Sequence, residues 1–136
     1  MTNSFVVFDS SIFVAYLRTA QHKDRISSVS GLLRTSSVVL AELWRGAATR
    51  ADREFLATLE KNHPVLVPSE QNWLESGQLL NTMRRDKGFR VDKLRDLHFD
   101  VLIALTARSI GARVITSNRD DFELIASYKP IHLEIW

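Results

Sequence analysis

The sequence predicts an α/β fold: a three-layer α/β/α sandwich in which helices cover both faces of a central, mostly parallel sheet. Short apolar runs alternate with longer segments of helical periodicity, the pattern of strand–helix–strand units. The first run, 5–8, is apolar at every position, as expected of a strand buried on both faces. At 136 residues the chain has the length of one domain, so we expect a single domain over 1–136.

Five elements are expected to follow this strand in the first half of the chain. Serines at 10 and 11 stand before an apolar periodic segment, where helix-capping residues are found, and Asp52 stands in the same way before a later one. The predicted order is a helix beginning at Ser10 or Ser11, a helix over 25–33, a strand over 36–39, a helix containing Glu42, and a helix capped by Asp52.

The second half is predicted to hold three strands and at least two helices. A short strand lies between the helix-breaking residues Pro64 and Pro68, and Ser69 caps a long helix that ends near Gly88. In that helix Trp73, Gly77, Leu80 and Met83 recur at helical spacing. Later elements are a buried helix over 99–110 with Gly111 as its stop, a strand over 113–116, and a half-exposed edge strand over 131–135.

The composition is that of an ordinary globular protein, 45% hydrophobic and 25% charged. There are no cysteines, which excludes disulfides and cysteine–zinc sites and fits a reducing compartment. Residues 1–4 carry no cation before the first apolar run, and that run is too short for a signal core. No apolar stretch approaches the roughly 20 residues of a membrane span. We therefore expect a cytoplasmic protein.

Positive charge gathers in residues 84–95. This segment holds six basic residues against two aspartates, a net of +4, whereas the whole chain carries +2. A basic segment on an otherwise balanced chain indicates phosphate binding. The alternative is a solvated helix end and loop.

Acidic and polar residues recur where predicted strands pass into helices. Asp9 follows the first strand, Glu42 interrupts the apolar run 38–44, Asp100 begins the buried helix, and a polar cluster over 116–121 follows a late strand. Because the carboxyl ends of parallel strands meet at one edge of the sheet, these side chains are expected to converge. Clustered carboxylates repel one another unless they hold a cation.

Each of these residues also has a structural alternative. Asp9 and the 116–121 cluster have the residue types of helix caps and turns, and Glu42 has an alternative partner in a helix N-terminus. Asp96, one turn before Asp100, is a rival for its role, ranked lower because it precedes the apolar run. Together the acids favour Mg²⁺ or Mn²⁺, which take hard oxygen ligands and activate water against a phosphodiester.

These residues resemble the PIN domain, a metal-dependent ribonuclease fold, and particularly the VapC toxins of prokaryotic toxin–antitoxin pairs. The resemblance covers nearly the whole chain. Asp9-Ser10-Ser11 is similar to the family's opening motif, and Glu42-Leu43 with Gly46 to its Glu-Leu-x-x-Gly. The longest match runs from Asp100 to Phe122 and comprises Asp100, Ile103-Ala104, Ala107, Gly111, Ile115-Thr116, Asn118 and Asp121-Phe122.

The resemblance implies the roles of the site residues. Asp9, Glu42 and Asp100 would be acidic metal ligands. The fourth family position, acidic in many members, is Asn118 here; Asp120 or Asp121 would compensate, or Asn118 would bind through water. Ser11 replaces the commoner asparagine. The family also implies Mg²⁺ or Mn²⁺, a homodimer, and an antitoxin that presents an arginine to the acids.

The resulting expectation is an endoribonuclease in which activated water attacks RNA and leaves a 5′-phosphate and a 3′-hydroxyl. The residues expected to serve catalysis are Asp9, Glu42, Asp100, Asn118 and Asp121, supported by Ser10 and Thr116. The residues expected to contact the RNA backbone are Arg84, Arg85, Arg90, Lys93, Arg45 and Arg119.

Other functions fit the sequence less well. A PIN-like module that binds RNA or protein without cleaving it stays open, because Asn118 replaces an acid. A metal-independent histidine mechanism has no support in the scattered positions His22, His63, His98 and His132. A haloacid-dehalogenase phosphatase needs a second aspartate where Ser11 stands. A response-regulator receiver needs an acidic pair and a late lysine, and the chain has neither.

Overall fold

The computed structural model describes residues 4–136. Met1–Asn3, on which the expectation of no signal sequence partly depends, lie outside the described residues. Among the described helices, none is long and apolar enough to span a membrane. The elements in chain order are β1 (Phe5–Phe8), α1 (Ser10–Thr19), α2 (Lys23–Ser28), β2 (Leu32–Leu33), β3 (Thr35–Ser36), α3 (Ser37–Gly46), α4 (Arg50–Asn62), β4 (Val65–Leu66), α5 (Glu70–Lys87), α6 (Val91–Ser109), β5 (Arg113–Thr116), α7 (Arg119–Tyr128) and β6 (His132–Ile135).

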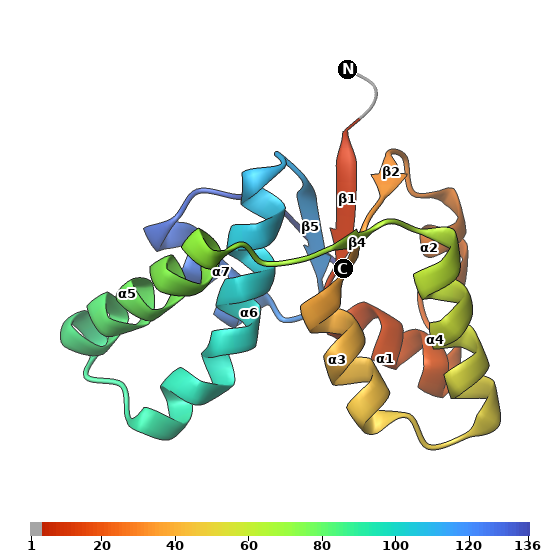
Figure 1. Ribbon diagram of the computed structural model, residues 1–136, viewed down its shortest axis with the longest axis horizontal. Coiled ribbons are helices and arrows are strands. Elements are labelled where there is room, and N and C mark those ends of the chain that lie inside the picture. The colour runs from red at the N-terminus through yellow and green to blue at the C-terminus, as the bar shows by residue number, and fades with distance from the viewer. Residues whose placement is uncertain (1–3) are drawn as a thin grey trace.

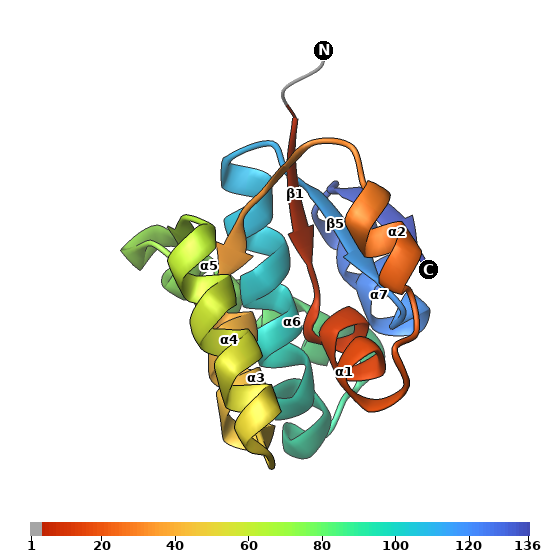
Figure 2. The same ribbon diagram turned by 90° about the vertical axis from the view of Figure 1, so that its right-hand side faces the viewer.

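The central sheet has four parallel strands in the order β2-β1-β5-β6, and β3 and β4 form a separate parallel pair. Figure 2 shows α3, α4 and α6 on one side of β1 and α1 and α2 on the other, while α7 packs against α6 and β6. The predicted α/β/α sandwich with a parallel sheet is therefore confirmed. β1 and β5 are central, with Phe8 opposite Ile115 at their carboxyl ends.

The core lies on both faces of these two central strands. Val6, Val7 and Phe8 of β1 are buried, and so is every residue of α6 from Val101 to Ala107. The predicted buried helix is confirmed, but α6 begins eight residues earlier than expected, at Val91. Its first two turns project beyond the sheet, and this projection places basic residues near the carboxyl edge.

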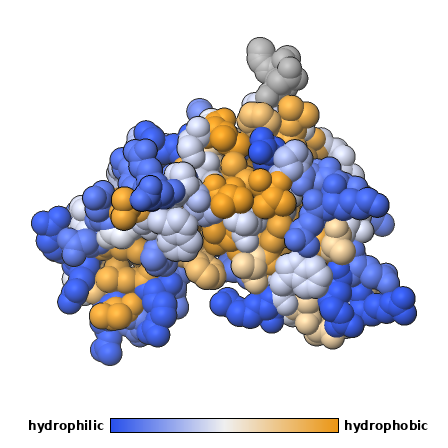
Figure 3. Space-filling view, viewed as in Figure 1, coloured by the Kyte–Doolittle hydropathy of each residue, from blue (hydrophilic) through white to orange (hydrophobic). Residues whose placement is uncertain are grey.

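The carboxyl ends of β1 and β5 open into a hollow between two arms of the molecule. In Figure 1 one arm consists of α5 and the first turns of α6, and the other of α1, α3 and α4. Figure 3 shows the same opening as a notch in the lower surface. Side chains that follow β1 and β5 therefore lie at the head of this notch.

Several predicted boundaries in the first half are wrong. The helix expected over 25–33 is α2, which ends at Ser28 because Val29 takes an extended conformation, and it is followed by β2. Gly31 lies between the two elements with φ +117°. The strand expected over 36–39 ends at Ser36, whose hydroxyl caps α3 by accepting from Val38 and Val39 N–H. Thr49, not Asp52, is the N-cap of α4, and Asp52 completes its capping box.

For α1 and α5, some of the predicted capping residues and buried residues are confirmed and others are wrong. Asp9, not Ser10 or Ser11, caps α1. Ser69 caps α5 and Gly88 ends it with φ +67°, as predicted. Trp73, however, is half exposed, because α5 buries the neighbouring stripe that contains Ser76, Leu80 and Met83.

Replacing Gly31 with alanine is expected to lower the free energy of unfolding by about 1–3 kcal/mol. A Cβ at this position would lie 2.7 Å from the Ser4 carbonyl oxygen and 2.8 Å from Val6 Cγ2, and the positive φ adds backbone strain. Urea unfolding followed by circular dichroism measures the loss. The matched control is Gly77→Ala in α5, where a Cβ meets nothing within 4 Å, so helix propensity predicts a small gain. Equal stability of the two variants would contradict the expectation.

Candidate metal and RNA site

Asp9 lies at the carboxyl end of β1, and its two carboxylate oxygens have different surroundings. Its N–H donates to the Ile115 carbonyl at 2.9 Å, which fixes the backbone against β5. Oδ2 accepts from the Ser11 hydroxyl and the Thr116 hydroxyl, each at 2.8 Å. Oδ1 is buried and accepts no hydrogen bond from the described residues. Oδ2 of Asp9 therefore serves as a helix cap, as one interpretation of the sequence expected, and Oδ1 is available to a ligand.

Thr116 connects this carboxylate to the polar segment that follows β5. Its hydroxyl also accepts from the Asn118 N–H at 2.9 Å, and the Ser11 hydroxyl accepts from the Ser117 N–H at 3.0 Å. Two hydroxyls thus tie the end of β1 to the end of β5. Thr116, which was predicted to support the site, and Ser11, which was noted only as a substitution in the motif, both donate to Asp9 Oδ2.

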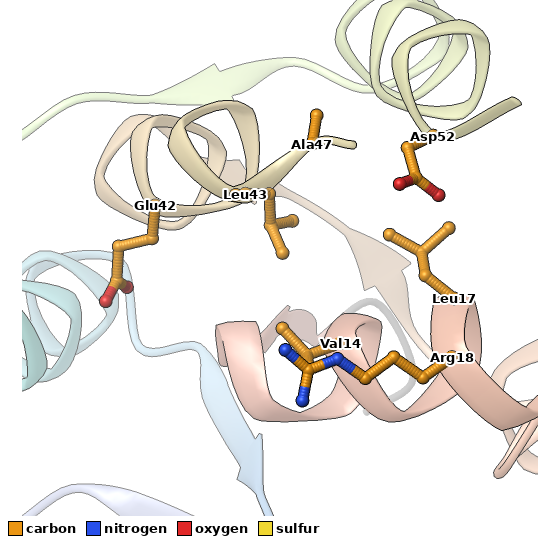
Figure 4. Close-up of a pocket in the computed structure, with 8 residues that line it drawn as sticks. Val14, Leu17, Arg18, Glu42, Leu43, Ala47 and Asp52 are labelled. Carbon is orange, nitrogen blue, oxygen red and sulfur yellow. The ribbon is translucent and has the colours of Figure 1, made fainter. Parts of the chain in front are cut away.

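Glu42 comes to the same edge from α3. Burial raises the pKa of Glu42, and the Asp9 carboxylate raises it further; a hydrogen bond from Ser10 and the charge of Arg45 act in the opposite direction. Oε1 is buried and has no hydrogen-bond partner within residues 4–136. Figure 4 shows its carboxylate at the end of a cavity of about 130 Å³, directed away from Leu43 and Ala47 toward α6.

Asp100 comes from the middle of α6, on the opposite side of the notch. Burial, followed by the charges of Asp9, Glu42 and Asp121, raises the pKa of Asp100 to about 8. The structure therefore brings the three predicted acids close enough for their charges to interact. Asp96, the rival candidate, is exposed.

Asn118 and Asp121 complete the cluster. The Asn118 side-chain amide donates to Asp100 Oδ2 and to Asp121 Oδ2, both at 3.2 Å, and so bridges two carboxylates. Asp121 also accepts from Lys93 Nζ at 3.0 Å. Asp120, by contrast, is exposed. Asp121 rather than Asp120 therefore lies with the predicted ligands.

The basic residues predicted to bind RNA are divided among several places. The Arg45 guanidinium lies 5.9 Å from the centre of the Phe99 ring, across the notch from its own helix α3. Arg90 pairs with Asp92 at 3.6 Å, and Arg119 with Glu123 at 3.1 Å.

Arg84 borders a shallow groove between α5 and α6 together with Val91, Arg95 and His98. At 100° per residue, these α6 positions lie on the face opposite Asp100. Arg84 is therefore not directed at the acids. Arg85 is exposed in the last turn of α5.

Sequence reasoning missed Arg18. This residue lines the cavity beside Glu42 in Figure 4, with Val14 and Leu17. A signal was present, because Arg18 follows Ser11 by seven residues, two helical turns along one face of α1. Arg18 adds a cation near the notch.

The residues at this edge fit a hard divalent cation. Asp9 Oδ1 and Glu42 Oε1 are buried oxygens that have no partner among residues 4–136, and buried polar atoms are normally satisfied. Carboxylate oxygen is the ligand type that Mg²⁺ and Mn²⁺ prefer. Across residues 4–136, no three His, Cys, Asp or Glu side chains form a ready-made metal-binding group.

The fold and the site define a class of α/β proteins that gather carboxylates at the carboxyl edge of a parallel sheet. Within that class, the chain belongs to the PIN domain family, whose model matches residues 6–127. No curated protein matches the chain.

Solved structures similar to the chain include several VapBC toxin–antitoxin structures, which confirms the predicted resemblance. DNA-bound VapBC from Salmonella typhimurium is 27% identical, with a TM-score of 0.69 and 98% of each chain covered. VapBC-5 from Mycobacterium tuberculosis, a member of the VapBC toxin–antitoxin family, is 28% identical, with a TM-score of 0.62 and 97% of each chain covered. VapC20 from Mycobacterium tuberculosis, a sarcin-ricin loop cleaving toxin, is 17% identical, with a TM-score of 0.65 and 88% of this chain and 94% of that chain covered.

Proposed function

We propose that the protein is a metal-dependent endoribonuclease and the toxin of a toxin–antitoxin pair. The observation that supports this proposal most is a pair of buried oxygens, one on Asp9 and one on Glu42, that have no hydrogen-bond partner in the described part of the chain. Their charges act on Asp100, at the edge where ligands bind in parallel sheets. The proposal extends to one nuclease domain over 1–136 and to a cytoplasmic location, which the absence of cysteine supports.

In this proposal Asp9, Glu42 and Asp100 hold Mg²⁺ or Mn²⁺. Such a cation lowers the pKa of water and offsets negative charge on the phosphodiester. Thr116 and Ser11 fix the rotamer of Asp9 by binding its Oδ2, and Ser10 lowers the pKa of Glu42. The products are a 5′-phosphate and a 3′-hydroxyl.

The RNA backbone is proposed to enter the notch between the two arms. The charge of Arg45 acts on Glu42, and Arg18 lines the same cavity as Glu42. The positive charge of these two arginines supports contact with phosphates nearest the cut. Arg85, Arg90 and Arg119 are exposed on the adjoining surface. Arg84 faces the α5–α6 groove, so a contact with it requires RNA that extends beyond the notch.

The proposed protein partner is an antitoxin, by analogy with the VapBC complexes. The cavity in Figure 4 offers it the apolar side chains of Val14, Leu17 and Leu43, and Glu42 lies at one end of that cavity. A peptide with apolar residues and one arginine matches this surface, with the arginine directed at the acids. A homodimer is also proposed, and exposed Val65 and Val67 supply apolar surface of the kind that such an interface buries.

Cleavage of a mixed tRNA and mRNA pool tests the proposal. We expect Mn²⁺-dependent cleavage that EDTA abolishes and that falls more than about 100-fold in Asp9→Asn, because a ligand is lost. Asp120→Asn, which changes an exposed acid of the same region, is expected to keep the activity. Cleavage unaffected by EDTA and by Asp9→Asn would overturn the proposal.

The second candidate is a PIN-like module that binds RNA or protein without cutting. Asn118 favours it, because an amide stands where many relatives carry an acid and donates to two of the remaining carboxylates. RNA binding without cleavage under all the metal conditions above would support this function instead.

A further inference from the structure

Lys93 is a cation within the acidic cluster, although the sequence placed it with residues that bind RNA. Its position on α6 is seven residues before Asp100, so the two lie on nearly the same face of the helix. Its Nζ is 3.0 Å from Asp121 Oδ1, with the lysine side chain 41% exposed and the carboxylate side chain 24% exposed. Its charge also acts on Asp100, whose pKa it lowers.

The hydrogen bonds divide the cluster into an open side and a closed side. On the open side, Asp9 Oδ1 and Glu42 Oε1 accept nothing from the described residues. On the closed side, both oxygens of Asp121 are occupied, Oδ1 by Lys93 and Oδ2 by the Asn118 amide. A cation can bind Asp9 Oδ1 and Glu42 Oε1 without displacing a group of the described residues. A cation that binds Asp121 must displace the Lys93 ammonium.

We propose that Lys93 is a positioning residue that limits the site to one divalent cation. It holds Asp121 against Asn118 and supplies the positive charge on that side of the cluster. The inference rests on the proposed function, because it concerns how many ions the acidic site binds. If Lys93 has this role, it is not one of the residues that contact the RNA backbone.

The test is a Mn²⁺ titration of the full chain at pH 8 by calorimetry and by electron paramagnetic resonance. We expect one Mn²⁺ per chain in the wild type and two in Lys93→Met, since the variant frees Asp121 and removes a repelling charge. Lys93→Arg keeps the charge and is expected to restore a stoichiometry of one. Lys87→Met, an exposed lysine of α5, changes the net charge equally and is also expected to bind one ion.

The possible failures are distinct. A wild type that binds no Mn²⁺ would overturn the proposed function and this inference with it. A wild type and a Lys93→Met variant that both bind one ion, with unchanged circular dichroism, would overturn the inference alone. If that variant instead flattens the salt dependence of RNA binding at unchanged stoichiometry, Lys93 is an RNA contact.

Discussion

Replacing Asp100 with asparagine is expected to abolish RNA cleavage while making the EDTA-treated protein more stable. The carboxyl is buried among Asp9, Glu42 and Asp121, which together raise the pKa of Asp100 to about 8. Asparagine has nearly the same shape without the charge, so it removes the repulsion and also the metal ligand. At pH 8 we expect a gain of about 1–3 kcal/mol in the free energy of unfolding.

The size of this gain in stability depends on pH. The folded-state pKa lies above the model value of 3.8, so ionising Asp100 destabilises the fold increasingly as pH rises from 3.8 toward about 8. The advantage of Asp100→Asn should therefore be largest at pH 8 and small near pH 4. At pH 8, where Asp100 ionises, the cleavage rate should fall more than about 100-fold.

Thermal and urea unfolding in EDTA measure the gain, and Asp96→Asn provides the control. Asp96 stands one turn earlier on the same helix and is exposed, so its replacement should change neither stability nor cleavage. A stable and fully active Asp100→Asn protein would remove Asp100 from the site. An inactive but destabilised protein would contradict the account of charge repulsion.

The elements that the sequence predicted correctly can be recognised from their own residues, without contacts distant in the chain. β1 is apolar at every position, β5 has the apolar pair Val114-Ile115 at its centre, and the helix between Ser69 and Gly88 has a capping residue at each end. Asp9 was found in the same way, because it follows a strand whose direction is fixed by the parallel sheet. Strand order and register did not need to be known for these predictions.

The parts that failed depend on contacts distant in sequence. Leu32 and Leu33 have ordinary helix propensity, and their pairing with Phe5 and Val6 makes them a strand. Lys93 looks like a solvated helix residue until α7 places Asp121 beside it, twenty-eight positions along the chain. Charge patterning identified the basic segment but not which of its cations faces the acids and which faces the groove.

The structure gives the Asn118 substitution a physical interpretation. A fourth acid at this position would stand within hydrogen-bond distance of both Asp100 and Asp121 and would add like charge to both. The amide donates to both instead. Asn118 therefore reduces the charge of the cluster, as Lys93 does, and both residues act on the side that contains Asp121.

The apparent affinity for Mn²⁺ is expected to rise steeply with pH up to about 8 and then to level off. Below that value Asp100 carries a proton, because its neighbours and its burial hold its pKa at about 8. An ion that takes the carboxylate must displace this proton, so the affinity should fall up to about tenfold for each pH unit below 8. Glu42, whose pKa is also raised, acts in the same direction.

Calorimetric titrations of the wild-type chain at pH 6, 7 and 8 test this expectation at constant ionic strength. The predicted loss between pH 8 and pH 6 is up to about 100-fold, accompanied by release of close to one proton per ion at pH 7. Repeating the pH 7 titration in two buffers of different ionisation enthalpy counts that proton directly. An affinity that is constant over this range, with no proton released, would mean that the ion binds without Asp100. The metal would then be held by oxygens that are already ionised, and Asp100 would contribute to cleavage in another way or not at all.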